Sequence, residues 1–112
     1  MSETETLIQK LMTAIRASEP VERDRAADEV TDVHRGLSRA QVEAIARALV
    51  AARLEESDAK CEESQLNALS ELSAWHQIDR EILAPLAALR LGAEQQCQLE
   101  YLEQLLRPGA SG

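Results

Sequence analysis

The feature that most restricts the fold of this chain is a hydrophobic pattern that recurs about every 38 residues. The apolar positions of residues 7–12 recur at 45–50 and again at 82–87. The same shift, taken twice, also places the second predicted helix on the sixth. Stacked helical hairpins need about three copies before they bury a continuous core. The sequence therefore predicts three stacked antiparallel hairpins, and an irregular helical bundle is the alternative.

Composition favours an all-α fold. Leu and Ala dominate the chain, which contains no Phe, one Trp and one Tyr. The β-branched and aromatic residues that favour strands are scarce, whereas residues that favour helices are abundant. Because 45% of the residues are hydrophobic, the chain is able to bury a core. We expect one helical domain over residues 1–107 and a flexible tail over 108–112.

About six helices follow from the apolar periodicity and from residue types that begin or end helices. The expected boundary residues are, in chain order, Ser2 with Glu5 as a capping box, Pro20 in a first turn, Ser38 with Gln41 as a second capping box, Ser57 or Asp58 and then Asp79 as N-caps, and Gly92 as the end of the fifth helix.

Two stretches of the chain resemble the HEAT-type helical repeat. Ile82-Leu83-Ala84-Pro85-Leu86-Ala87-Ala88-Leu89 looks like the first helix of a unit, in which a proline commonly bends the helix; the first two units lack this proline. Glu19-Pro20-Val21-Glu22-Arg23-Asp24-Arg25-Ala26-Ala27 resembles the turn and the start of a second helix. The resemblance implies a short curved solenoid that binds partners on a concave face formed by the second helices. It implies no reaction.

The side chains that catalysis and metal binding require are scarce. Cys61 and His76 lie about 22 Å apart on one predicted helix, and no Cys-x-x-Cys or paired-histidine spacing occurs. No Gly-x-Ser-x-Gly elbow and no glycine-rich phosphate loop is present. We therefore expect no catalytic residues, no metal, no cofactor and no enzyme activity. Cys61 and Cys97 are expected to be buried and unreactive, and His34 to lie at a helix C-terminus.

The chain is expected to be cytoplasmic and without a membrane partner. No apolar run approaches the roughly 18–20 residues of a membrane span. Met1 is followed by polar and acidic residues rather than by the basic and apolar segments of a secretory leader.

A helix-turn-helix DNA-binding regulator over residues 32–54 is the alternative function. Gly36 lies at the turn position, four arginines give the segment local positive charge, and Gln41 is placed to contact a base edge. Asp32, however, occupies a position where the motif prefers a small residue, and the net charge of −8 opposes attraction to phosphates. Nucleic acid is therefore an unlikely partner.

Acidic clusters give the stronger indication of function. Six carboxylates against two arginines lie between Glu19 and Asp32, and five against one lysine between Glu55 and Glu63. Like charges spaced four residues apart on a helix cost stability, which suggests a partner of opposite charge, although solubility alone is an equally good explanation. The candidate partner-binding residues are Asp24, Asp28, Asp32, Asn67, Ser70, Glu71, Trp75, Glu100 and Glu103.

Trp75, at the end of the fourth predicted helix, is expected in the core, with an exposed binding anchor as the alternative. The small size, the acidity and the lack of reactive groups together predict a non-enzymatic protein-binding module. Its partner is expected to be a protein with a basic surface, for example a toxin domain bound by an inhibitor of the bacterial immunity type.

Overall fold

The structure, a computed structural model, describes residues 2–107, so the tail predicted at 108–112 lies outside the described residues. Within this range the regular structure is entirely helical, which confirms the predicted all-α class with six helices. The α-helices are α1 (Glu3–Ile15), α2 (Pro20–Val33), α3 (Arg39–Glu55), α4 (Ala59–Trp75), α5 (Arg80–Leu83) and α6 (Gln96–Leu106). Short 3-10 turns follow α2, follow α5 and precede α6: η1 (His34–Gly36), η2 (Ala84–Ala88) and η3 (Ala93–Gln95).

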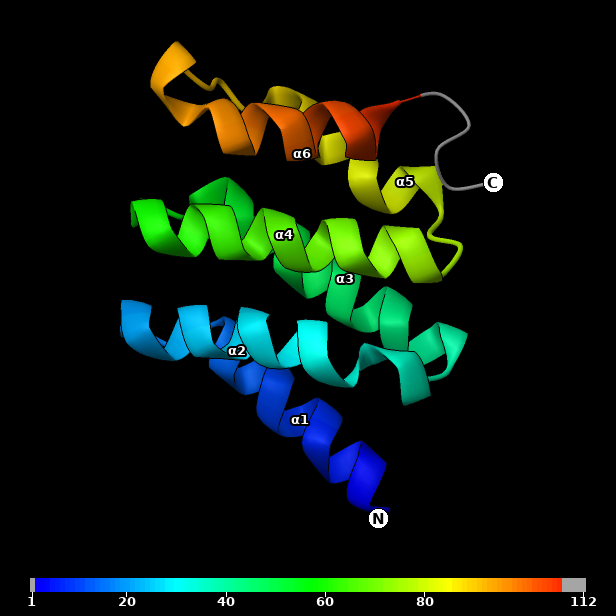
Figure 1. Ribbon diagram of the computed structural model, residues 1–112. Coiled ribbons are helices and arrows are strands. Elements are labelled where there is room, and N and C mark those ends of the chain that lie inside the picture. Colours follow the sequence, from blue (N-terminus) through cyan, green and yellow to red (C-terminus); the bar gives the residue numbers. More distant parts are fainter. Residues whose placement is uncertain (1, 108–112) are drawn as a thin grey trace.

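The helices pack in two layers (Figure 1). Helices α2, α4 and α6 lie side by side in one layer, and α1, α3 and α5 lie behind them in the other. Helix α1 packs on α2, α3 packs on α4, and α6 contacts η2, which gives three hairpin-like pairs. The smallest dimension of the molecule is 19 Å, about two helix diameters. The prediction that the three pairs are copies of one repeated unit stays a prediction.

The hydrophobic core lies between the two layers and runs through all three pairs. Apolar side chains on the inner faces of both layers are buried, and each contributes about 1.5–3 kcal/mol relative to an exposed position. The largest of them are Leu11, Ile15, Ile45, Leu49, Leu66, Leu69, Leu72, Ile78, Leu83 and Leu86. This continuous core fixes α2, α4 and α6 as neighbours and so determines which polar residues share their outer surface.

Most of the predicted helix starts are confirmed. Ser38 and Gln41 form a complete capping box: the Ser38 hydroxyl accepts from the Gln41 backbone N–H at 3.2 Å, and the Gln41 side chain accepts from the Ser38 backbone N–H at 2.8 Å. Asp58 rather than Ser57 caps α4, because its carboxylate accepts from the backbone N–H of Cys61 at 3.0 Å. These bonds satisfy backbone donors that have no partner within the helix.

The predicted length of the fifth helix is wrong. Helix α5 ends at Leu83, well before Gly92, and the 3-10 turn η2 follows it to Ala88. Pro85 explains the early end, because it has no backbone N–H to donate and its ring crowds the preceding turn. The predicted apolar positions are nevertheless largely correct, since Ile82 and Leu86 are buried.

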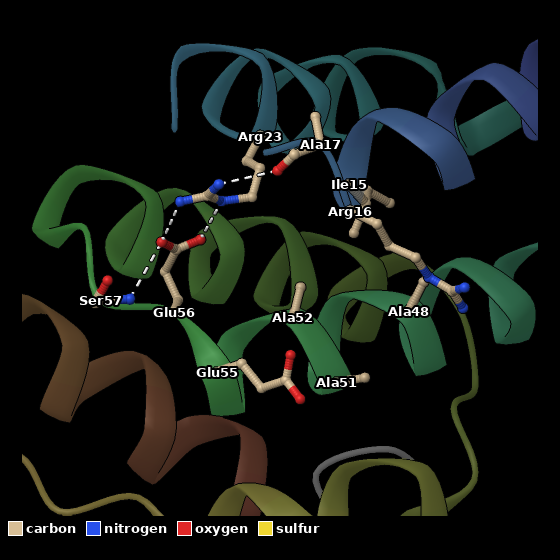
Figure 2. Close-up of a pocket in the computed structure, with 10 residues that line it drawn as sticks. All are labelled: Ile15, Arg16, Ala17, Arg23, Ala48, Ala51, Ala52, Glu55, Glu56 and Ser57. Atoms are coloured by element: carbon tan, nitrogen blue, oxygen red, sulfur yellow. Dashed lines mark hydrogen bonds and ion pairs between the residues drawn. The ribbon is translucent and has the colours of Figure 1, made fainter. Parts of the chain in front are cut away.

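A charged side-chain pair connects the first two helix pairs. Arg23 of α2 donates from Nε and from one terminal nitrogen to the two carboxylate oxygens of Glu56, both at 2.8 Å (Figure 2). Its other terminal nitrogen donates to the carbonyl oxygens of Ala17 and Ser18, each at 2.9 Å. Arg23 therefore joins the α1–α2 turn to the α3–α4 turn through four hydrogen bonds.

The Glu56 side chain is only 2% exposed, yet it stays ionised. Burial alone would raise the pKa of Glu56, but the bonds from Arg23, from the Asp58 backbone N–H and from the Gln65 side chain outweigh burial and hold this pKa at about 2. A carboxylate with this many donors is costly to protonate or to replace.

We predict that Glu56→Gln lowers the free energy of unfolding by about 3 kcal/mol at neutral pH, because it leaves Arg23 without its counter-charge. In the unfolded chain the carboxyl titrates near 4.5, above its folded pKa of about 2, so its contribution is complete above pH 4.5 and is lost as pH falls toward 2. Urea unfolding from pH 7 to pH 2 should show the gap between wild type and variant closing over that interval.

The matched control is Glu55→Gln, which removes the neighbouring exposed carboxylate and should cost little at any pH. A loss of equal size in both variants, or a gap that does not change with pH, would contradict the role given to Glu56.

Candidate protein-binding surface

An acidic hollow of about 330 Å³ lies over the junction of α2, α4 and α6. We define the acidic hollow by the residues that line it, which are Asp24, Asp28, Lys60, Glu63, Ser64, Asn67 and Tyr101. Three carboxylates from two helices thus face one lysine, while Tyr101 adds an aromatic wall from α6. The three helices form one layer (Figure 1), and the hollow lies where side chains of all three meet.

Negative charge accumulates in this hollow. Lys60 Nζ lies 3.4 Å from an Asp24 carboxylate oxygen, but the Lys60 side chain is 82% exposed, so the pair is weak and easily exchanged. Partial desolvation raises the pKa of Asp28, the charges of Asp24 and Asp32 raise it further, and Lys60 opposes them. The pKa of Tyr101 is likewise raised, first by burial and then by Glu63. A positively charged group entering the hollow would relieve this repulsion.

The structure brings together some of the residues predicted for the binding surface. Asp24, Asp28 and Asn67 line the acidic hollow. Ser70 is committed to a bond within the layer, since its hydroxyl donates to the Gln104 side chain at 3.4 Å. The remaining residues predicted on α2 and α6 are exposed outside the lining of the hollow; these are Asp32, Glu100 and Glu103.

Four residues of the hollow were not predicted: Lys60, Glu63, Ser64 and Tyr101. Glu63 lies four residues before Asn67 and therefore on the same face of α4, a spacing that could have identified it. Lys60 and Tyr101 join the hollow only through the packing of α4 against its neighbours, which sequence periodicity does not show.

Trp75 and Glu71 belong to a second group at the far end of the α2–α4 contact. We define the histidine–tryptophan cluster as His34, Arg35, Glu71, Trp75 and His76. His34 is fully buried, and its Nδ1 lies 3.1 Å from His76 Nε2, so the pair connects the ends of α2 and α4. Glu71 lies on the other side of His34, 3.6 Å from Nε2.

Glu71 determines which ring nitrogen of His34 carries the proton. A neutral imidazole has one donor and one acceptor nitrogen. A proton on Nε2 faces the negative carboxylate of Glu71, which favours this tautomer, and Nδ1 then accepts a hydrogen bond from His76 Nε2. At 3.6 Å the carboxylate is too distant for a good hydrogen bond, and Nε2 is left buried without a partner.

The repeat pattern of the sequence identifies this histidine pair, although the pair was not predicted from it. Allowing for the longer connection before the fourth helix, Ala27 aligns with Leu69 in the repeat pattern. The same offset aligns His34 with His76. These equivalent positions of two stacked helices are in contact in the structure. His34 does lie at the end of α2, as predicted, but its environment is a buried contact rather than a solvated helix terminus.

The expectation that Trp75 is a core residue is wrong. Its side chain is 54% exposed at the last residue of α4, and Arg35 covers one face of its ring. Leu72, three residues earlier and near the same helix face, is fully buried, so the spacing was that of a core residue, but α4 ends at Trp75 and its side chain extends beyond the core.

The segment predicted as an alternative helix-turn-helix uses its polar groups internally. Gln41 closes the capping box of α3, and Arg53 is buried, where it donates to the Gln98 side chain at 2.7 Å and lies 3.6 Å from Glu62. Arg39 pairs with Glu43 at 3.4 Å. Helix α3 packs against both α1 and α5, so only a narrow outer face of α3 is left to contact a DNA groove.

A larger hollow of about 400 Å³ lies beside the Arg23–Glu56 pair. Figure 2 shows the Arg23 and Glu56 side chains pointing toward each other, whereas Arg16 and Glu55 point away from that pair. Its buried charges, Arg23 and Glu56, already satisfy one another, and four of the ten residues that line it are alanines.

The two cysteines differ in environment. Cys61 is buried, its thiol donates to the Pro20 carbonyl oxygen at 3.0 Å, and burial raises its pKa to about 11. Cys97 is exposed, so the prediction of two buried thiols is correct only for Cys61. Within residues 2–107, no three His, Cys, Asp or Glu side chains converge as a metal site would require. None of the helices described here has the length and apolarity needed to span a bilayer.

Comparison of the chain with models of known protein families, with curated proteins and with solved structures finds no match. The resemblance to HEAT-type repeats therefore stays a prediction. That resemblance assigns partner binding to the second helix of each hairpin, and the acidic hollow lies on α2, α4 and α6.

We predict that the pKa of His34 lies below 6.5 in the folded protein, because burial and the nearby His76 disfavour its charged form more than Glu71 favours it. The unfolded chain then binds the proton more readily, so this contribution to stability is complete above pH 6.5 and declines as pH falls below that value. An NMR titration of the His34 ring protons measures the midpoint directly.

Two variants should move this midpoint in opposite directions. His76→Asn removes a positive neighbour and should raise the pKa of His34, whereas Glu71→Gln removes a negative neighbour and should lower it. Arg35 also opposes protonation and is unchanged in both variants. A midpoint at or above 6.5 in wild type, or shifts of the same sign, would contradict this description of the cluster.

Proposed function

We propose that this protein is a non-enzymatic binding module that captures a basic partner protein on its α2–α4–α6 layer. The observation that supports this most strongly is the acidic hollow, in which Asp24, Asp28 and Glu63 converge from two helices around one exposed lysine. The pKa of Asp28 is raised first by burial and then by the charge of Asp24, so these two aspartates repel each other in the free protein. A folded chain tolerates such repulsion when binding relieves it.

The overall charge supports the same function. A net charge of −8 on 112 residues attracts a basic protein over a distance of several ångströms and speeds its association. An inhibitor of the bacterial immunity type is one form of this function, in which the acidic layer covers the basic active-site face of a toxin and blocks it stoichiometrically. Such an inhibitor acts by covering its target and needs no reactive group of its own.

Neutralising the hollow should weaken capture of a basic probe. We predict that Asp28→Asn combined with Glu63→Gln lowers the affinity for octa-lysine by about three- to tenfold at low salt, since each exposed charge pair contributes up to about 1 kcal/mol. The measurement is fluorescence anisotropy of the labelled peptide over a series of salt concentrations, and the difference between wild type and variant should shrink as salt increases.

The matched control is Glu5→Gln combined with Glu81→Gln, which makes the same change in net charge on exposed positions of α1 and α5. These helices form the opposite layer, so the control should lose less than about twofold in affinity. If both double variants lose affinity equally, the protein attracts cations through its net charge alone, and the proposed binding surface is wrong.

A further inference from the structure

Trp75 already holds a guanidinium group in the free protein. The Cζ atom of Arg35 lies 3.8 Å from the centroid of the Trp75 ring, which is a cation–π contact. Trp75 is the only tryptophan of the chain and remains 54% exposed, although large exposed aromatic side chains are rare here. No carboxylate within residues 2–107 forms an ion pair with Arg35 at 4.0 Å or less. The ring is therefore the group that holds this exposed arginine.

The cluster around Trp75 has a rigid base. Behind the indole ring, His34 is fully buried, with its ring centroid 6.5 Å from that of Trp75. His76, the residue after Trp75, bonds to His34 and so fixes the end of α4 against α2. The indole is thus presented on a fixed backbone, and the exposed Arg35, which follows His34 in η1, covers one face of it.

The acidic hollow and Trp75 are connected by one inclined row of residues on α4. Glu63, Asn67, Glu71 and Trp75 are spaced four residues apart, so the row spans about 18 Å and turns by about 120° around the helix axis. The row begins in the hollow and ends at the indole ring. Glu71, one turn before Trp75, has a carboxylate that is 39% exposed and so remains accessible to a cation beside the ring. A basic segment bound along this row would contact the hollow and the indole together.

We propose that Trp75 binds an arginine side chain of the basic partner on the ring face that Arg35 covers in the free protein, and that Glu71, one turn earlier on α4, adds negative charge nearby. This inference rests on the proposed function, because it assumes that a basic partner binds along the same row. Arginine suits the ring better than lysine because its planar guanidinium stacks flat on an aromatic face. Arg35 acts as an internal competitor that protects the exposed ring until the partner displaces it.

The test compares octa-arginine with octa-lysine, two peptides of equal charge whose extended length of about 26 Å exceeds the row. Wild type should bind octa-arginine at least about twofold more tightly, and this peptide should change the fluorescence of Trp75 more than octa-lysine does. In Trp75→Leu the preference for arginine should disappear, while salt-dependent binding of both peptides remains. Helicity measured by circular dichroism checks that the variant is folded.

Removing the internal competitor should strengthen binding. Arg35→Ala should bind octa-arginine about two- to fivefold more tightly than Arg47→Ala, which removes an equal charge from an exposed position of α3. Equal affinities for these two variants, or an unchanged preference for arginine in Trp75→Leu, would overturn the arginine site but leave the acidic hollow intact. Failure of wild type to bind either peptide would overturn both proposals, and insensitivity to Asp28→Asn with Glu63→Gln would overturn the hollow alone.

Discussion

The ion pair between Arg23 and Glu56 is the interaction on which the arrangement of the first two helix pairs depends. It joins the α1–α2 turn to the α3–α4 turn and buries a carboxylate that accepts five hydrogen bonds. Burying a charge is unfavourable unless its partners are held in place. The pair therefore favours one register of α2 against α4, and in that register Asp24 meets Lys60 at one end of the contact while His34 meets His76 at the other.

The acidic surface follows from this register. In a stack of parallel neighbouring helices, residues four apart on each helix form rows, and the packing decides which rows face each other. Here the row of aspartates on α2 lies beside the row on α4 that ends at Trp75. Carboxylates that would repel weakly on one helix are thereby concentrated between two, so the negative charge is localised at one place on the layer.

Local signals in the sequence were sufficient for the fold class and for several helix ends. Leucine and alanine periodicity predicted the helices, and the Ser38–Gln41 spacing predicted a capping box that is present. Predictions that depend on contacts between helices were less successful. Trp75 has the spacing of a core residue, yet it extends outward at the last turn of α4. Pro85 shortens α5, although the same residue was part of the pattern from which a longer helix was predicted. Asp24 and Asp28 were identified because they share a helix face, whereas Lys60 and Tyr101 reach the hollow only through packing.

The most direct test of the central claim, that the α2–α4–α6 layer is where a basic partner binds, is a map of backbone amide shifts by NMR as octa-lysine is added to the labelled protein. The account predicts shifts that follow the α2–α4 junction from Asp24 to Trp75 and extend to Tyr101, with α1, α3 and α5 largely unaffected. Shifts spread evenly over all carboxylate-bearing helices, or centred on the α1–α3–α5 layer, would contradict it.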